Sequence, residues 1–171
     1  MKITFLWFLS AGLLAGCATS LPVPPVLDPP ANESLAMVVP AKGVQIYECR
    51  AKKDSSGHEW AFVAPDAQLS DRTGRVIGTH GAGPFWQASD GSRVVGTVKQ
   101  RADAPIAGAI PWLLLATTPE GPQGAFSKVT SIQRVHTVGG IAPATGCGAT
   151  TSGTQTRVAY SADYYFFLPR Q

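Results

Sequence analysis

The sequence predicts an all-β domain, built as an antiparallel sandwich or small barrel of about eight or more short strands. From position 34 onward, short runs rich in β-branched and aromatic residues alternate with turn residues. No window sustains a capped helical period. The apolar fraction of 44% is typical of a folded chain, and the 18 glycines and 14 prolines supply many turns.

The predicted strands follow one another along the chain, each between turn residues. In order, they cover residues 34–39, 44–49, 59–63, 75–80, 85–88, 93–98, 110–118, 126–137 and 156–168. Residues 40–43 are predicted as the turn of a first hairpin, and 71–74 as the turn before the fourth strand. Pro65 ends the third strand, because proline cannot donate to a ladder. Asp90-Gly91, between the fifth and sixth strands, is a strong hairpin signal.

Three of these strands carry a clear burial pattern. Residues 110–118 are the most apolar stretch of the predicted domain and favour a strand buried on both faces, with an apolar helical turn as the alternative. Alternation in the second strand places Gln45, Tyr47 and Cys49 on one face. In the last strand it groups Val158, Tyr160, Ala162, Tyr164, Phe166 and Leu168.

Residues 1–17 predict an export signal. Lys2 supplies a positive charge, and an apolar run at 3–14 has signal-peptide length, short of the roughly 20 residues that a membrane-spanning helix needs. The run ends in Leu14-Ala15-Gly16-Cys17, which resembles the lipobox of bacterial lipoproteins. The resemblance implies cleavage before Cys17, a diacylglycerol on its thiol and an anchor in the lipid bilayer of the cell envelope. Ala18 in place of Asp favours the outer membrane. An ordinary secretory signal with a coincidental cysteine is the alternative.

The predicted organisation is a signal peptide at 1–16, a lipidated Cys17 with a proline-rich tether up to residue 33, and a single β domain at 34–171. Five prolines between positions 22 and 30 favour an extended polyproline conformation. We expect a spacer that holds the domain away from the bilayer. An extended strap packed along the domain is the alternative.

Assigning Cys17 to lipid leaves one pair of cysteines, Cys49 and Cys147. In an oxidising compartment this pair predicts a disulfide, and two buried free thiols are the alternative.

No CxxC accompanies the pair, and His58, His80 and His136 lack the close spacing of metal ligands, so no metal or other cofactor is predicted. The net charge of +3 comes from scattered basic residues rather than a basic stripe, which argues against nucleic-acid binding. An integral outer-membrane barrel is disfavoured by the lipobox and by Pro111 within the most apolar strand.

The densest group of chemically versatile side chains is His80, Trp86, Asp90 and Ser92, all within thirteen residues. As a ligand site, His80 would be a general base oriented by Asp90, and Trp86 would stack on a ring-shaped ligand such as a sugar. As structure, Asp90 would make the hairpin turn, away from His80, while Trp86 would pack in the core. We favour the structural interpretation, and no catalytic residue is assigned.

Arg134 is the remaining candidate for a ligand site. It lies between Ile132 and His136 on one face of a predicted strand, so we expect partial burial. A buried guanidinium needs a carboxylate or several carbonyls. Asp163 and Glu48 are the expected partners, and structural pairing is favoured over anion binding.

Six phrases, in order along residues 35–168, together resemble the domain of unknown function 3455 family of secreted bacterial and fungal proteins. They are Ala41–Cys49, Trp60–Pro65, His80–Trp86 with Asp90–Ser92, Ile110–Leu115, Ile132–Gly140 and Val158–Phe166. The resemblance covers nearly the whole predicted domain and implies no activity.

The leading interpretation is a membrane-anchored envelope lipoprotein with a non-catalytic binding or structural β domain, whose ligand or protein partner in the envelope is unidentified. The alternative is a small envelope hydrolase that acts on glycans or esters near His80 and Trp86. It requires an open cleft with an acid or a second imidazole within hydrogen-bond reach of His80. A third interpretation, a carrier of apolar ligands, requires a sizeable cavity.

Overall fold

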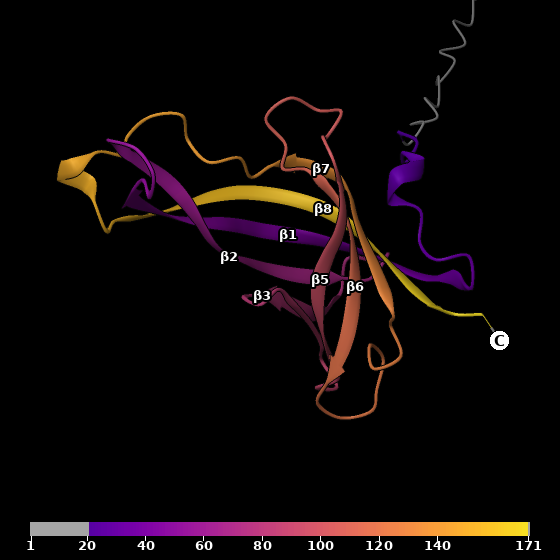
Figure 1. Ribbon diagram of the computed structural model, residues 1–171. Coiled ribbons are helices and arrows are strands. Elements are labelled where there is room, and N and C mark those ends of the chain that lie inside the picture. The colour runs from indigo at the N-terminus through magenta and orange to yellow at the C-terminus, as the bar shows by residue number, and fades with distance from the viewer. Residues whose placement is uncertain (1–20, 171) are drawn as a thin grey trace, which may run out of the picture.

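The structure is a computed structural model in which residues 21–170 are described (Figure 1). They form one closed sheet of eight antiparallel strands in sequence order, and the last strand pairs with the first. The all-β antiparallel fold class is therefore confirmed, in its barrel form. The strands are β1 (Glu33–Ala51), β2 (His58–Ser70), β3 (Val76–Gly81), β4 (Phe85–Ala88), β5 (Arg93–Ala102), β6 (Trp112–Glu120), β7 (Ser131–Gly139) and β8 (Gln155–Pro169).

Helical structure within residues 21–170 is limited to two single 3-10 turns, η1 (Pro25–Leu27) and η2 (Ala149–Thr151). None of the helices in this range is long and apolar enough to cross a membrane. Figure 1 shows the long β1 and β8 side by side, with β5, β6 and β7 crossing them at a steep angle.

The hairpin predicted at residues 40–43 is wrong, because β1 runs through this segment as one strand of 19 residues. Pro40 pairs with Asp163 of β8, while pairing with β2 begins only at Ala41, so the missing N–H of the proline faces no partner strand. Gly43 has a packing role instead. An added Cβ there would clash with the Asp66 carbonyl oxygen and lie 2.5 Å from the Ala67 Cα. Neither residue makes a turn.

Two other predicted boundaries are also wrong. Strand β2 continues past Pro65, which pairs with β1 on one side only, because pairing between β2 and β3 begins at Ala67. Strand β7 begins at Ser131 rather than at 126, since Phe126 closes a turn by accepting a hydrogen bond from the Val129 N–H. Phe126 and Val129 are nevertheless each only 1% exposed. Their apolar character reflects core packing outside a strand.

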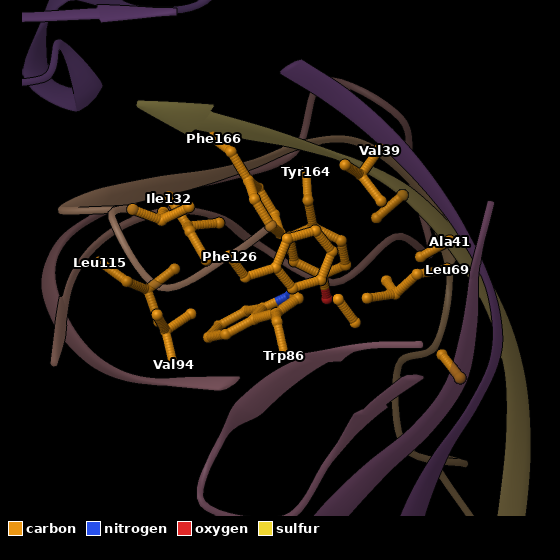
Figure 2. Packing of buried hydrophobic residues seen from close by; sticks show 14 of the residues in the cluster. Val39, Ala41, Leu69, Trp86, Val94, Leu115, Phe126, Ile132, Tyr164 and Phe166 are labelled. Atoms are coloured by element: carbon orange, nitrogen blue, oxygen red, sulfur yellow. The ribbon is translucent and has the colours of Figure 1, made fainter. Parts of the chain in front are cut away.

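A compact core fills one part of the barrel (Figure 2). Phe126 and Phe166 pack edge to face at 4.9 Å between ring centroids, and Trp86 meets Tyr164 at 5.3 Å. Figure 2 shows Leu115, Val94 and Ile132 on the opposite side of these rings from Val39 and Ala41. Tyr160, Ala162, Tyr164 and Phe166 of β8 all face this core, which agrees with the alternation in the sequence.

A second apolar cluster lies outside the barrel, beneath the N-terminal strap, by which we mean residues 21–32. Leu27 is fully buried there against Trp112 and Leu114 of β6 and Val135 of β7. The Gln133 amide donates to the Leu27 carbonyl at 2.6 Å. The described part of the proline-rich stretch is therefore a packed strap rather than a free spacer. It explains why β6 is apolar on both faces, since Leu113 and Leu115 face inward.

The strap is also held at its start by His136. This residue has a positive φ of 50° at an irregularity in the pairing of β7 with β8. Its ring lies between the Asp163 carboxylate (Nδ1–Oδ2, 3.0 Å) and the Leu21 carbonyl (Nε2–O, 3.2 Å), and its edge meets Trp112. The irregularity thus turns His136 outward, so the expectation that it shares a face with Arg134 is wrong.

Candidate functional site

A cavity of about 550 Å³ occupies the part of the barrel interior that the core leaves open. Its wall takes at least one side chain from each of the eight strands. Leu113 and Leu115 of β6 and Trp86 of β4 form its apolar inner wall, where it borders the core. The cavity is therefore the lumen of the barrel, and we use that name for it below.

The mouth of the lumen lies between β2 and β5. Strands β3 and β4 are short, so β2 before Ala67 and β5 after Val95 have no strand partner on their facing sides. Phe62 and Val63 of β2 and Val98 of β5 line the lumen there and are 52%, 39% and 51% exposed. Large apolar side chains exposed around an opening are a common mark of a binding site.

Arg134 of β7 is the principal charged group of the lumen wall, together with Arg101 of β5. The Arg134 Nε and Nη2 groups both donate to the Pro111 carbonyl, at 3.1 and 2.8 Å. The expected carboxylate partners are wrong, because Asp163 contacts His136 and Glu48 pairs with Arg50. Within residues 21–170, no carboxylate lies within 4 Å of the Arg134 guanidinium.

The positive charge of Arg134 acts on the tyrosines around it. Burial raises the pKa of Tyr47 and Tyr164 above the usual 10.0, and the opposing effect of Arg134 is smaller. Both phenols are therefore neutral at physiological pH. The Tyr47 hydroxyl donates to the Gly140 carbonyl at 2.6 Å, which fixes its ring at the edge of the lumen. Neither Tyr47 nor Tyr164 therefore supplies a negative charge to balance the positive charge of the Arg134 guanidinium.

Two other donors in the lumen wall lack acceptors. The Gln45 side-chain Nε2 and the Trp86 indole Nε1 are buried without a hydrogen-bond partner in the described part of the chain. The two residues are 2% and 1% exposed. Buried donors normally find an acceptor. Sequence reasoning missed Gln45 as a site residue, although its place on the same strand face as Tyr47 and Cys49 was a usable signal.

His80 lines the lumen but is only 3% exposed. Its Nδ1–H donates to the Phe85 carbonyl at 2.7 Å, and its ring stacks on Trp86 at 4.4 Å between centroids. Burial lowers the pKa of His80 to about 3, and the charge of Arg134 acts in the same direction. The imidazole is thus a neutral, packed group. The residues that line the lumen include neither an acid nor a second imidazole.

The predicted group of four splits into two separate parts. His80 and Trp86 are stacked in the lumen wall, whereas Asp90 and Ser92 hold a loop. The Asp90 carboxylate accepts from the Ser92 N–H, the Ser92 hydroxyl and the Ala125 N–H, at 2.9, 2.6 and 2.8 Å. The Ser92 hydroxyl in turn accepts from the Phe126 N–H at 3.0 Å. Hydrogen bonds from Ser92 and Ala125 lower the Asp90 pKa. The Asp90 carboxylate thus joins the turn at residues 90–92 to the segment that begins at Ala125.

The predicted disulfide between Cys49 and Cys147 is present. It joins β1 to the long connection between β7 and β8, across 98 residues of sequence. Nearby, the Trp60 indole donates to the Thr145 carbonyl at 2.9 Å, so β2 also supports this connection.

Cys17 and the predicted export segment lie outside the described residues. In residues 21–170, no three or more His, Cys, Asp and Glu side chains gather into a group that could hold a metal ion.

Comparison with known proteins places the domain in a family. The family described as "Protein of unknown function (DUF3455)" matches residues 29–168, which include the end of the strap from residue 29 and the whole barrel except the last residue of β8. No curated protein and no solved structure matches the chain. The resemblance found in the sequence is confirmed: the chain belongs to the DUF3455 family, whose function is unknown.

Proposed function

We propose that this chain is an envelope lipoprotein whose β domain binds a small, largely apolar ligand in the lumen without catalysing a reaction. The observation that carries the proposal is the cavity of about 550 Å³ with its exposed apolar mouth. Ligand sites commonly measure about 300–1,000 Å³. If each non-hydrogen atom takes about the 30 Å³ of a liquid water, the lumen holds roughly 15–20 of them. This matches one acyl chain and is too small for a two-chain phospholipid.

The geometry supports binding better than hydrolysis. A hydrolase centred on His80 needs an exposed imidazole with an acid or a second imidazole beside it. His80 is instead buried, hydrogen-bonded to the Phe85 carbonyl and stacked on Trp86. The stacked ring also covers one face of Trp86, which a sugar would otherwise use. His80 and Trp86 therefore serve as packed parts of the lumen wall.

The membrane anchor is the second part of the proposal and rests on the lipobox-like sequence that ends at Cys17. Four residues of chain, from Cys17 to Leu21, span at most about 14 Å. Because His136 holds the Leu21 carbonyl at the barrel, a lipid on Cys17 would keep the domain close to the bilayer. The Cys17→Ser variant should then lose incorporation of radiolabelled palmitate, and undiminished labelling would refute the anchor.

The lumen proposal can be tested by quenching of Trp86 fluorescence. A bromine atom quenches tryptophan only at short range, so 11-bromoundecanol, a neutral chain that fits the lumen, reports on a bound ligand next to Trp86. We expect saturable quenching of the protein held in zwitterionic lipid nanodiscs. Trp86→Phe should remove the saturable component, which separates it from quenching of Trp60 and Trp112.

A matched pair of variants locates the path into the lumen. Val98 and Val138 are both 51% exposed, but only Val98 lines the lumen. Val98→Tyr narrows the mouth and should weaken or slow binding several-fold, whereas Val138→Tyr should not. Absence of saturable, Trp86-dependent quenching in the unchanged protein would overturn the proposed function.

A further inference from the structure

The lumen wall is rich in positive charge and in hydrogen-bond donors. Among its lining residues, Arg101 and Arg134 are cationic, and Asp and Glu are absent. A guanidinium held away from bulk water without an anion is costly, because its desolvation is only partly compensated. The half-buried Arg134 donates to the Pro111 carbonyl and lies close to the neutral Tyr164 hydroxyl, and neither group carries a negative charge. This imbalance favours a ligand that brings a negative charge.

The orientation of the guanidinium also specifies the shape of that group. Nε and Nη2 of Arg134 both point at the Pro111 carbonyl. The opposite edge, formed by Nη1 and the second hydrogen of Nη2, meets no carboxylate among residues 21–170, and the nearby Tyr164 hydroxyl is neutral. Two parallel N–H groups on one edge match the two oxygens of a carboxylate. Pro111 thus positions Arg134 with this edge available.

Gln45 supplies an independent observation that points to the same kind of ligand. Its side chain lines the lumen and is 98% buried, since only 2% is exposed, and its Nε2 has no acceptor. An amide nitrogen only donates, so what it lacks is an acceptor. A ligand with acceptor oxygens next to Arg134 would satisfy this amide, which the folded chain leaves unpaired.

We propose that the ligand is a single-chain anionic amphiphile, bound by its carboxylate to Arg134 and Gln45 and by its apolar chain to Trp86, Leu113 and Leu115. This inference rests on the proposed function and gives it a ligand class. The charge comes from the donor side chains, and the single chain follows from the cavity of about 550 Å³. Val98 and Arg101 of β5 both line the lumen, so its wall offers contacts to an apolar chain and to a negative charge.

The test compares two probes with the same apolar body, 11-bromoundecanoate and 11-bromoundecanol. Each is titrated into the unchanged protein and into Arg134→Gln in the same nanodiscs, so that partition of the probe into lipid cancels between the two proteins. We expect Arg134→Gln to weaken binding of the carboxylate about tenfold or more and to leave the alcohol within about twofold, as loss of a charge-assisted hydrogen bond implies. Arg157→Gln, an exposed arginine of β8 outside the lumen, is the matched control and should change neither probe.

Each outcome decides the inference. Unchanged carboxylate binding in Arg134→Gln overturns it, because the head would then lie elsewhere. Equal loss of both probes also overturns it, because Arg134 would then only shape the lumen through Pro111. Retained binding of the alcohol shows that the variant is folded and that its lumen is open. If neither probe quenches Trp86 in the unchanged protein, the proposed function itself fails; if only the alcohol binds, the proposed function stands and this inference fails.

Discussion

Replacing Leu27 by alanine removes the side chain that holds the strap against the barrel. Leu27 is fully buried against Trp112, Leu114 and Val135. Burial of a leucine side chain stabilises a fold by about 1.5–3 kcal/mol, and the cavity left by truncation raises the usual loss to about 2–5 kcal/mol. The strap lies near one end of the described chain and can relax into the space, so we expect a loss of about 3 kcal/mol.

Val26 provides the matched control, because it directly precedes Leu27 in the same 3-10 turn and is 51% exposed. Equilibrium unfolding in urea, followed by Trp112 fluorescence, gives the free energy of unfolding for both alanine variants. Val26→Ala should stay within about 0.5 kcal/mol of the unchanged protein. If Leu27→Ala is no less stable than Val26→Ala, the strap does not pack as described and the stretch is a spacer.

Three further predictions concern the barrel. Replacing Cys49 and Cys147 together by alanine opens a 98-residue connection and should lower the free energy of unfolding by about 2–5 kcal/mol; a loss below about 1 kcal/mol would contradict this. Burial lowers the His80 pKa from 6.5 to about 3, so its contribution to stability is present above pH 6.5 and is lost as the pH falls toward 3. NMR titration should therefore find the ring neutral at about pH 5, and a protonated ring there would refute the burial. Gly43→Ala should destabilise by about 1–3 kcal/mol through backbone overlap with Asp66, while Gly148→Ala, which meets no atom within 4 Å, should be nearly neutral in the same urea assay.

Alternation allowed the buried faces to be predicted from the sequence, because the side-chain period of a strand is a local property. Alternation grouped Tyr160 to Phe166 on one face of their strand and Gln45 to Cys49 on one face of theirs, and the structure buries both groups. The disulfide followed from cysteine counting once Cys17 was set aside. These predictions needed only neighbouring residues or composition.

The strand boundaries at Pro40 and Pro65 could not be predicted in the same way. Whether a proline interrupts a strand depends on which of its edges has a partner, and this depends on the register between strands that are distant in sequence. Both prolines lie just beyond the end of a ladder, where a missing N–H costs nothing. The same limit applies to Gly43, which is required by the closeness of β2 rather than by a turn.

The lumen was the least predictable feature. Arg134 was singled out in the sequence, but its lack of a carboxylate partner emerges only when β7, β1 and the Pro111 segment come together. A cavity is space that side chains leave unfilled, and no local pattern records it. The mouth likewise arises because β3 and β4 are shorter than the strands on either side.

The most direct test of a ligand-binding lumen is anomalous X-ray diffraction from crystals of the protein grown with 11-bromoundecanoate. The bromine signal locates the chain without assumptions about fluorescence. We predict one bromine peak inside the barrel, in the space bounded by Trp86, Leu113 and Leu115, with the carboxylate on Arg134. Bromine peaks confined to the outer surface, with the lumen unoccupied or closed by side chains, would contradict the account.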